Sequence, residues 1–98
     1  MDLNVIKLSQ VAGAAYGKFA YTYRVLKEAN VDNKEEKNLV NLTLEAGNEA
    51  EETFNKVEEA LVGVNDDESI ILRQMVESWR ESIQGFKNVY GVSTEPKA

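Results

Sequence analysis

Apolar residues recur every three or four positions in three long segments of the chain, and this spacing is its most restrictive feature. None of the segments shows the sustained alternation that a half-buried strand requires. The single proline stands at position 96, so no proline interrupts the first ninety residues. The pattern predicts an all-α fold with helices at about 3–29, 34–62 and 66–90.

Each expected helix carries one apolar stripe that needs a partner surface. The stripes are Val5, Leu8, Ala12, Ala15, Phe19, Tyr23 and Leu26; then Leu39, Thr43, Ala46, Ala50, Phe54, Val57 and Leu61; then Leu72, Met75, Trp79, Ile83, Phe86 and Tyr90. Short connections make consecutive helices antiparallel neighbours, so the stripes can bury one another in a three-helix bundle. A chain of 98 residues has room for one such core, expected over 1–92, with a flexible polar tail at 93–98.

Residues that tolerate a left-handed backbone precede a valine at each expected helix end, an order typical of Schellman-type stops. These pairs are Asn30-Val31, Gly63-Val64 and Gly91-Val92. Asn33 and Asn65, each followed three residues later by an acid, are the expected N-caps of the second and third helices.

Small residues and the single tryptophan are expected in one cross-section of the bundle. Antiparallel pairing places Gly47 between the levels of Gly13 and Gly17, and Trp79 near the level of Glu49. The simplest interpretation is packing, because the glycines make room for the indole ring and for close contact between helices.

The first helix is more apolar than one buried face requires. A helix that is apolar on more than one side is usually buried on more than one side. We therefore expect a homo-oligomer assembled through Val11, Ala14, Gly17, Tyr21 and Val25. The alternative is a wide face that the two other helices cover.

The chain contains no histidine and no cysteine. Catalytic triads, thiol nucleophiles, redox pairs and zinc sites of the Cys/His kind are therefore excluded. No glycine-rich phosphate loop is present either. The expectation is a protein without catalytic residues, cofactor or metal site.

Charge is segregated along the chain. Residues 31–69 carry twelve acidic and three basic side chains, whereas the segments before and after them carry net charges of +2 and +1. Nucleic acid and anionic membrane are unsuitable ligands for such a surface. A protein partner with a basic surface suits it, and the expected contact residues are Glu45, Glu49, Glu52 and Glu59. A solvated acidic face without any partner is the alternative.

A second group of residues suits a different ligand. Tyr16, Lys18, Tyr21, Tyr23 and Arg24 place aromatic rings beside two cations, which could bind a small anionic aromatic molecule such as a nucleotide. Ordinary aromatic packing with snorkelling cations explains the same residues.

Together these features favour a non-enzymatic interaction module: an adaptor, inhibitor or regulatory subunit, in its sharpest form a nucleic-acid mimic. The alternative function is an oligomer that sequesters a small anionic ligand. No signal-like or membrane-spanning stretch is evident, so the expected location is the cytoplasm. A small secreted helical protein would have a similar size, although no Trp-x-Gly turn lies between the expected helices.

Overall fold

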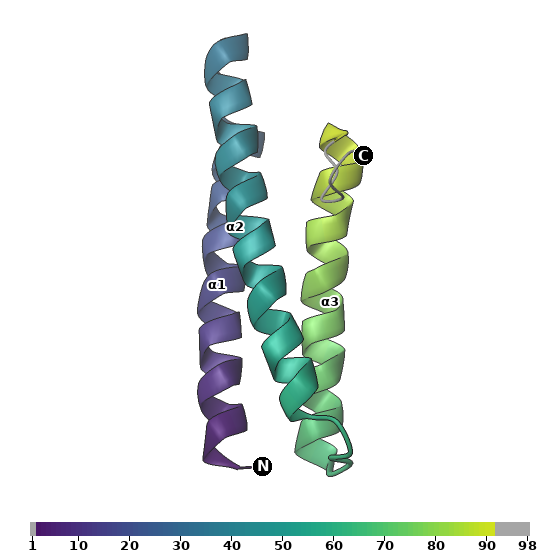
Figure 1. Ribbon diagram of the computed structural model, residues 1–98. Helices are drawn as coiled ribbons and strands as arrows, with labels where there is room; N and C mark the ends of the chain where they lie inside the picture. The colour runs from purple at the N-terminus through teal and green to yellow at the C-terminus, as the bar shows by residue number, and fades with distance from the viewer. Residues whose placement is uncertain (1, 92–98) are drawn as a thin grey trace, which may run out of the picture.

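The computed structural model describes residues 2–91, which form three α-helices and no strand. Helix α1 spans Leu3–Glu28, α2 spans Asn33–Ala60 and α3 spans Asp67–Tyr90. Each end lies within two residues of its predicted position. The chain runs along α1, returns along α2 and reverses again into α3 (Figure 1). The predicted all-α bundle is confirmed.

Ion pairs between neighbouring helices define how the helices align. Lys18 of α1 pairs with Glu49 of α2 at 3.2 Å. Further along the chain, Glu51 pairs with Lys87 and Glu58 pairs with Arg80. In the α2–α3 pairs, a later position on α2 meets an earlier position on α3, as antiparallel neighbours require.

The core lies along the predicted stripes. Phe19, Phe54 and Phe86 contribute one fully buried ring from each helix. The third stripe differs at one step, because Val76 is buried whereas Met75 is 44% exposed. Met75 therefore belongs to the edge of the core, where α3 turns toward solvent.

The bundle is flattened. Its Cα atoms extend over 48 × 32 × 17 Å, so it is about twice as wide as it is thick. Helices α1 and α2 lie close together along their length, while the backbone of α3 stands farther from α1 (Figure 1). Contact between α1 and α3 is made by large side chains, and this arrangement leaves a seam between the two helices.

Aspartates rather than asparagines cap the helix N-termini. The carboxylates of Asp2, Asp32 and Asp66 each accept the backbone N–H three residues later, at 2.8–2.9 Å. The prediction of Asn33 and Asn65 as caps is wrong by one residue in each case. A carboxylate at the N-cap also faces the positive end of the helix dipole, which favours aspartate over the neighbouring asparagine.

The helix stops were predicted in part. Gly63 and Gly91 have positive φ angles of 78° and 64°, as the stop pattern requires. Asn30 does not, because α1 ends in extended backbone at Ala29 and within residues 2–91 only glycines have a positive φ. Val92 and the expected tail at 93–98 lie outside the described residues.

The expected packing of the glycines on Trp79 holds for Gly13 but not for Gly47. A Cβ atom built on Gly47 would lie 3.1 Å from Ile83 and 3.3 Å from Phe19, so Gly47 makes room for these two side chains. Gly13 is the glycine that lies against Trp79, with 3.7 Å between its built Cβ and the indole ring. Trp79 also packs on Phe54 rather than at the level of Glu49, with ring centroids 5.9 Å apart.

Candidate functional site

The predicted acidic face lies on the outer side of α2. Glu45, Glu49, Glu52 and Glu59 are all exposed, opposite the buried stripe of the helix. Glu49 pairs with Lys18 of α1. Within residues 2–91 the other three have no ion pair, and they follow one another at intervals of seven residues. At 1.5 Å per residue this spacing places them about 10 Å apart in one line.

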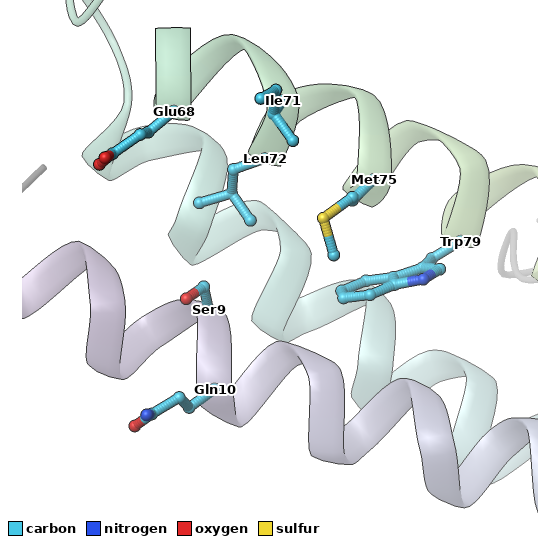
Figure 2. A pocket seen from close by; sticks show the side chains of 7 residues that line it. All are labelled: Ser9, Gln10, Glu68, Ile71, Leu72, Met75 and Trp79. Atoms are coloured by element: carbon cyan, nitrogen blue, oxygen red, sulfur yellow. The ribbon is translucent and has the colours of Figure 1, made fainter. Parts of the chain in front are cut away.

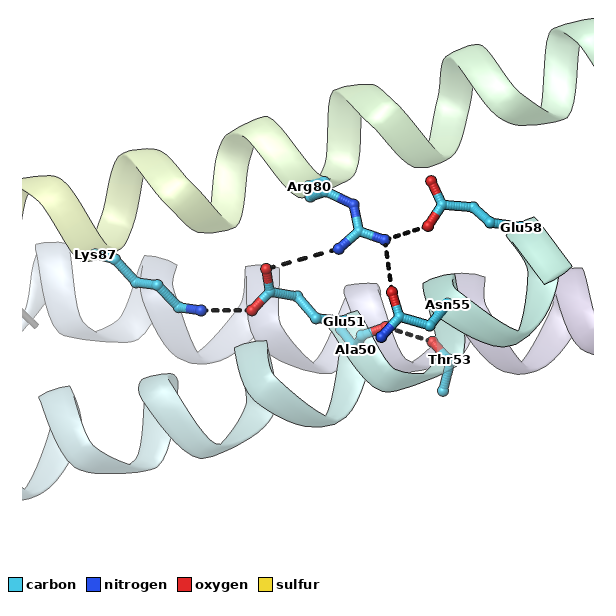
Figure 3. Close-up of polar contacts among 7 residues, drawn as sticks. All are labelled: Ala50, Glu51, Thr53, Asn55, Glu58, Arg80 and Lys87. Carbon is cyan, nitrogen blue, oxygen red and sulfur yellow. Dashed lines mark hydrogen bonds and ion pairs between the residues drawn. The ribbon is translucent and has the colours of Figure 1, made fainter. Parts of the chain in front are cut away.

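The remaining acids of central α2 point toward α3 (Figure 3). The guanidinium of Arg80 donates to Glu58 and to Asn55 and also lies 4.0 Å from Glu51. The ammonium of Lys87 donates to the other oxygen of Glu51, and its side chain is only 1% exposed. These residues join the two helices, so Glu51 and Glu58 are engaged with cations of α3.

Sequence reasoning missed this set of contacts, although the spacing contains a signal. Arg73, Arg80 and Lys87 recur every seven residues on α3, and Glu51 and Glu58 do the same on α2. Two such heptad rows of opposite charge face each other when the helices are antiparallel. Arg73, the first of the row, donates to the backbone carbonyls of Leu61 and Val64 at the α2–α3 connection.

The seam between α1 and α3 is hollowed at two places. The first hollow, about 340 Å³, lies toward the N-terminal ends of both helices. It is lined by Ser9, Gln10, Glu68, Ile71, Leu72, Met75 and Trp79. Figure 2 shows the side chains of Leu72, Met75 and Trp79 reaching from α3 toward α1. The lining is mainly apolar and opens to solvent.

The second hollow, about 460 Å³, lies toward the C-terminal ends of α1 and α3. Its lining contains two cations and no acidic side chain. The lining residues are Tyr16, Phe19, Ala20, Tyr23, Arg24, Lys27, Ser82, Gly85, Phe86 and Val89. Three of the five residues predicted to bind an anionic ligand, Tyr16, Tyr23 and Arg24, therefore meet at this hollow.

The other two predicted ligand residues lie elsewhere. Lys18 is directed to Glu49 of α2, and the Tyr21 side chain is 69% exposed away from the hollow lining. Lys27, which was not predicted, is 4.8 Å from the centroid of the Tyr23 ring. It takes the place of Lys18 as the second cation.

An aromatic cluster separates and supports the hollows. Tyr16 stacks on Trp79, with ring centroids 5.2 Å apart and planes 11° from parallel. Beyond this pair, Tyr23 packs against the edges of Phe86 and Tyr90. Burial raises the pKa of the Tyr90 phenol, and the nearby Tyr23 and Glu36 act in the same direction. The aromatic residues are thus mostly engaged with one another, with one face of the cluster lining the second hollow.

The predicted self-association strip lies on another side of α1. Val11, Ala14, Gly17 and Tyr21 are exposed, and Val25 is half-buried. A Cβ atom built on Gly17 meets nothing within 4 Å. The two other helices leave Val11, Ala14, Gly17 and Tyr21 exposed and cover Val25 in part.

The fold and its surfaces define a small all-α protein whose exposed features are an acidic helix and a partly apolar seam. None of the family models, curated proteins or solved structures compared with the chain matches it. Among residues 2–91, no cluster of three acidic side chains is arranged to hold a metal ion. In the same range, the helices lack a stretch long and apolar enough to cross a membrane.

Proposed function

We propose that the protein is a non-enzymatic interaction module that binds a basic protein surface through the outer face of α2. The observation that supports this proposal is the division of the α2 acids. Glu49, Glu51 and Glu58 pair with cations of α1 and α3, whereas Glu45, Glu52 and Glu59 remain exposed in one line.

The spacing of Glu45, Glu52 and Glu59 suits a folded basic partner. The three carboxylates are about 10 Å apart, close to one Debye length at 0.1 M salt, so their mutual repulsion is small. Asn48 is exposed between Glu45 and Glu52, and Asn41 is exposed one turn before Glu45. Both add amide donors and acceptors to the same face. Opposed cations would give fast, salt-sensitive association with this rigid helix.

The charge density favours a plain protein contact over nucleic-acid mimicry. Duplex DNA carries a negative charge about every 1.7 Å of its axis, whereas the outer line carries one about every 10 Å. A protein whose cations are spaced to bind the phosphates of DNA would find a carboxylate for only a few of them on this face.

Affinity capture with matched variants tests the proposal. The chain is immobilised and the proteins retained from a cell extract are quantified at low and high salt. The variant Glu52→Gln/Glu59→Gln loses partners that depend on the line, and Glu77→Gln/Glu81→Gln, on exposed positions of α3, is the control with equal net charge. Equal retention by both variants would refute a role for the α2 face.

A second candidate function is the binding of a small anionic aromatic ligand in the second hollow. The observation in its favour is the lining itself, where Tyr16 and Tyr23 lie beside Arg24 and Lys27. No acidic side chain belongs to this lining, and the pair that Arg24 forms with Glu28 lies outside it. A volume of about 460 Å³ lies in the range typical of small-molecule sites.

Thermal unfolding with added ATP, AMP or inorganic phosphate tests this candidate. A ligand that binds only the folded state raises the free energy of unfolding by RT ln(1 + [L]/Kd), so the unfolding temperature rises with ligand concentration. The shift should vanish in Arg24→Gln/Lys27→Gln. The absence of any shift with the wild-type chain at millimolar nucleotide would exclude nucleotides of this kind.

A further inference from the structure

The surface of α3 beside the seam carries a regular row of residues that the proposed function does not use. This α3 row consists of Asp67, Ile71, Met75, Ser78, Ser82, Gly85 and Val89. Its members are three or four positions apart and therefore share one side of the helix. Ile71, Met75 and Val89 are 57%, 44% and 72% exposed. Between Asp67 and Val89 the row contains no charge.

The facing side of α1 has the same character. Ser9, Gly13 and Ala20 are small and uncharged, and the first charges toward the C-terminus are Arg24 and Lys27. The seam is therefore neutral along its middle, acidic at the Asp67 end and basic at the Lys27 end. The Tyr16–Trp79 stack lies near its midpoint, with one hollow on either side.

Apart from Val89, the large and small residues of the α3 row lie in opposite halves. When a second α3 lies antiparallel with Ser78 opposite Ser78, Ile71 falls opposite Gly85 and Met75 falls within one residue of Ser82. Gly85 and Ser82 line the second hollow, and a Cβ atom built on Gly85 meets nothing within 4 Å. The large side chains of each copy thus meet the open hollow of the other. In a parallel arrangement, large residues would meet large ones.

The charges favour the same arrangement. A two-fold axis near Ser78 brings the acidic end of one seam onto the basic end of the other, so that Asp67 lies near the level of Lys27 of the second copy. Parallel seams would place like charges together, which costs affinity. The seam is roughly 33 Å long and about 20 Å wide over two helices, or about 660 Å², close to the area per partner of a standard interface.

We propose that the α1–α3 seam is the interface of an antiparallel homodimer, in which Ile71 and Met75 of each copy enter the hollow beside Ser82 and Gly85 of the other. The α2 face lies on the opposite side of the flattened bundle, so the dimer presents two acidic lines. This proposal uses different residues from the binding of a basic partner through α2, and either can fail without the other. It does use the second hollow, so dimerisation and ligand binding there would compete.

The mass in solution over a range of concentrations is the first test. We expect 22 kDa, twice the 11.0 kDa of the chain, with dissociation on dilution. Ile71→Glu should raise the dimer Kd about 30-fold or more, because a buried charge replaces an apolar contact. Val11→Glu changes an equally exposed residue on the self-association strip of α1 and should leave the Kd unchanged. A monomer at millimolar concentration, or dissociation by Val11→Glu alone, overturns the proposal.

Disulfide trapping tests the antiparallel register, since the chain has no cysteine of its own. Ser78→Cys should form a covalent dimer on mild oxidation, whereas Glu77→Cys, exposed at the preceding position and about 100° around α3, should not. Ile71→Cys alone should remain uncrosslinked, and Ile71→Cys/Gly85→Cys should crosslink between copies. Efficient crosslinking of Ile71→Cys alone would indicate parallel seams and overturn the proposed arrangement.

A charge exchange tests the ends of the seam. Lys27→Glu and Asp67→Lys should each weaken the dimer, and the combined variant should recover most of the loss. Circular dichroism of each variant confirms that the helices are retained. Additive weakening in the combined variant, with helices intact, would contradict the pairing of the two ends.

Discussion

The buried ammonium of Lys87 on α3 donates to the carboxylate of Glu51 on α2. The two partners are buried to different degrees, since the Lys87 side chain is 1% exposed and the Glu51 side chain 21%. Arg80 lies 4.0 Å from the second oxygen of Glu51. The glutamate can therefore keep a cation and some water when Lys87 is removed, whereas Lys87 has no second acid among its contacts in residues 2–91.

This asymmetry predicts unequal effects of removing either partner. Glu51→Ala should lower the free energy of unfolding by about 3 kcal/mol, because it leaves a buried ammonium without its counter-charge. Lys87→Met keeps the packing volume and removes the buried charge, so the loss should stay below about 1.5 kcal/mol. Urea unfolding of both variants measures the difference. Equal losses would show that Lys87 gains solvent when its partner is absent.

Arg73 holds the connection between α2 and α3. Its guanidinium donates to the carbonyls of Leu61 and Val64, near the C-terminal end of α2 where backbone acceptors lack helical partners. We expect Arg73→Met to lower the free energy of unfolding by about 2 kcal/mol, through the loss of two hydrogen bonds to a charged donor. Arg24→Met, which removes an exposed pair with Glu28, should change it by less than about 0.5 kcal/mol in the same urea experiment. Similar losses in both variants would contradict a special role for Arg73.

Much of the fold follows from the sequence, because helical periodicity depends on local spacing. The buried hydrophobic residues of α1 and α2 lie on the predicted stripes, although Thr22 and Gly47 are buried outside them. Two of the three expected glycine or asparagine stops have the expected backbone. The N-caps were misplaced because Asp32-Asn33 and Asn65-Asp66 each offer two adjacent capping residues. The helix dipole favours the aspartate over the adjacent asparagine. This difference in energy is small, and the sequence pattern does not show which of the two residues caps the helix.

The site was less predictable, since it depends on the rotation of each helix about its axis. The sequence indicated an acidic α2, but only the packing separates Glu51 and Glu58, which face α3, from Glu52 and Glu59, which face outward. The ligand residues were grouped by their nearness in sequence. Lys18 and Tyr21 leave the group because a helix turns by 100° per residue, and Lys27 joins it one turn beyond Tyr23.

Replacing Gly17 or Gly47, both within helices, by alanine should have opposite effects on the free energy of unfolding. Gly17→Ala adds a methyl group where nothing lies within 4 Å, so the gain in helix propensity should raise the free energy of unfolding by about 0.5–1 kcal/mol. Gly47→Ala gains the same propensity but places a Cβ atom 3.1 Å from Ile83 and 3.3 Å from Phe19, both fully packed.

The crowding at Gly47 should cancel or exceed the propensity gain, because small-to-large changes in a filled core typically cost 1–3 kcal/mol, roughly the size of the gain or more. Thermal or urea unfolding should therefore place Gly47→Ala at least about 1 kcal/mol below Gly17→Ala in stability. If both variants gain equally, the Phe19 and Ile83 side chains must shift readily, and the core at this level is looser than the distances indicate.

Acid should weaken the fold partly through Asp66. The backbone N–H of Ser69 donates to the Asp66 carboxylate and holds the pKa of this group below its ordinary value of 3.8. A lowered folded-state pKa means that the unfolded chain binds the proton first as the pH falls. The stabilisation is therefore complete well above pH 3.8, and it is lost as the pH drops through the folded-state value.

Asp66→Asn retains an oxygen that can cap the helix but does not titrate. The difference in unfolding free energy between the wild type and Asp66→Asn should be constant above about pH 5 and should shift against the wild type toward about pH 2. Urea unfolding at a series of pH values measures this difference, in which the shared titration of the other carboxylates cancels. A difference that stays constant down to pH 2 would mean that the Ser69 N–H interacts equally with the ionised and the protonated carboxyl group.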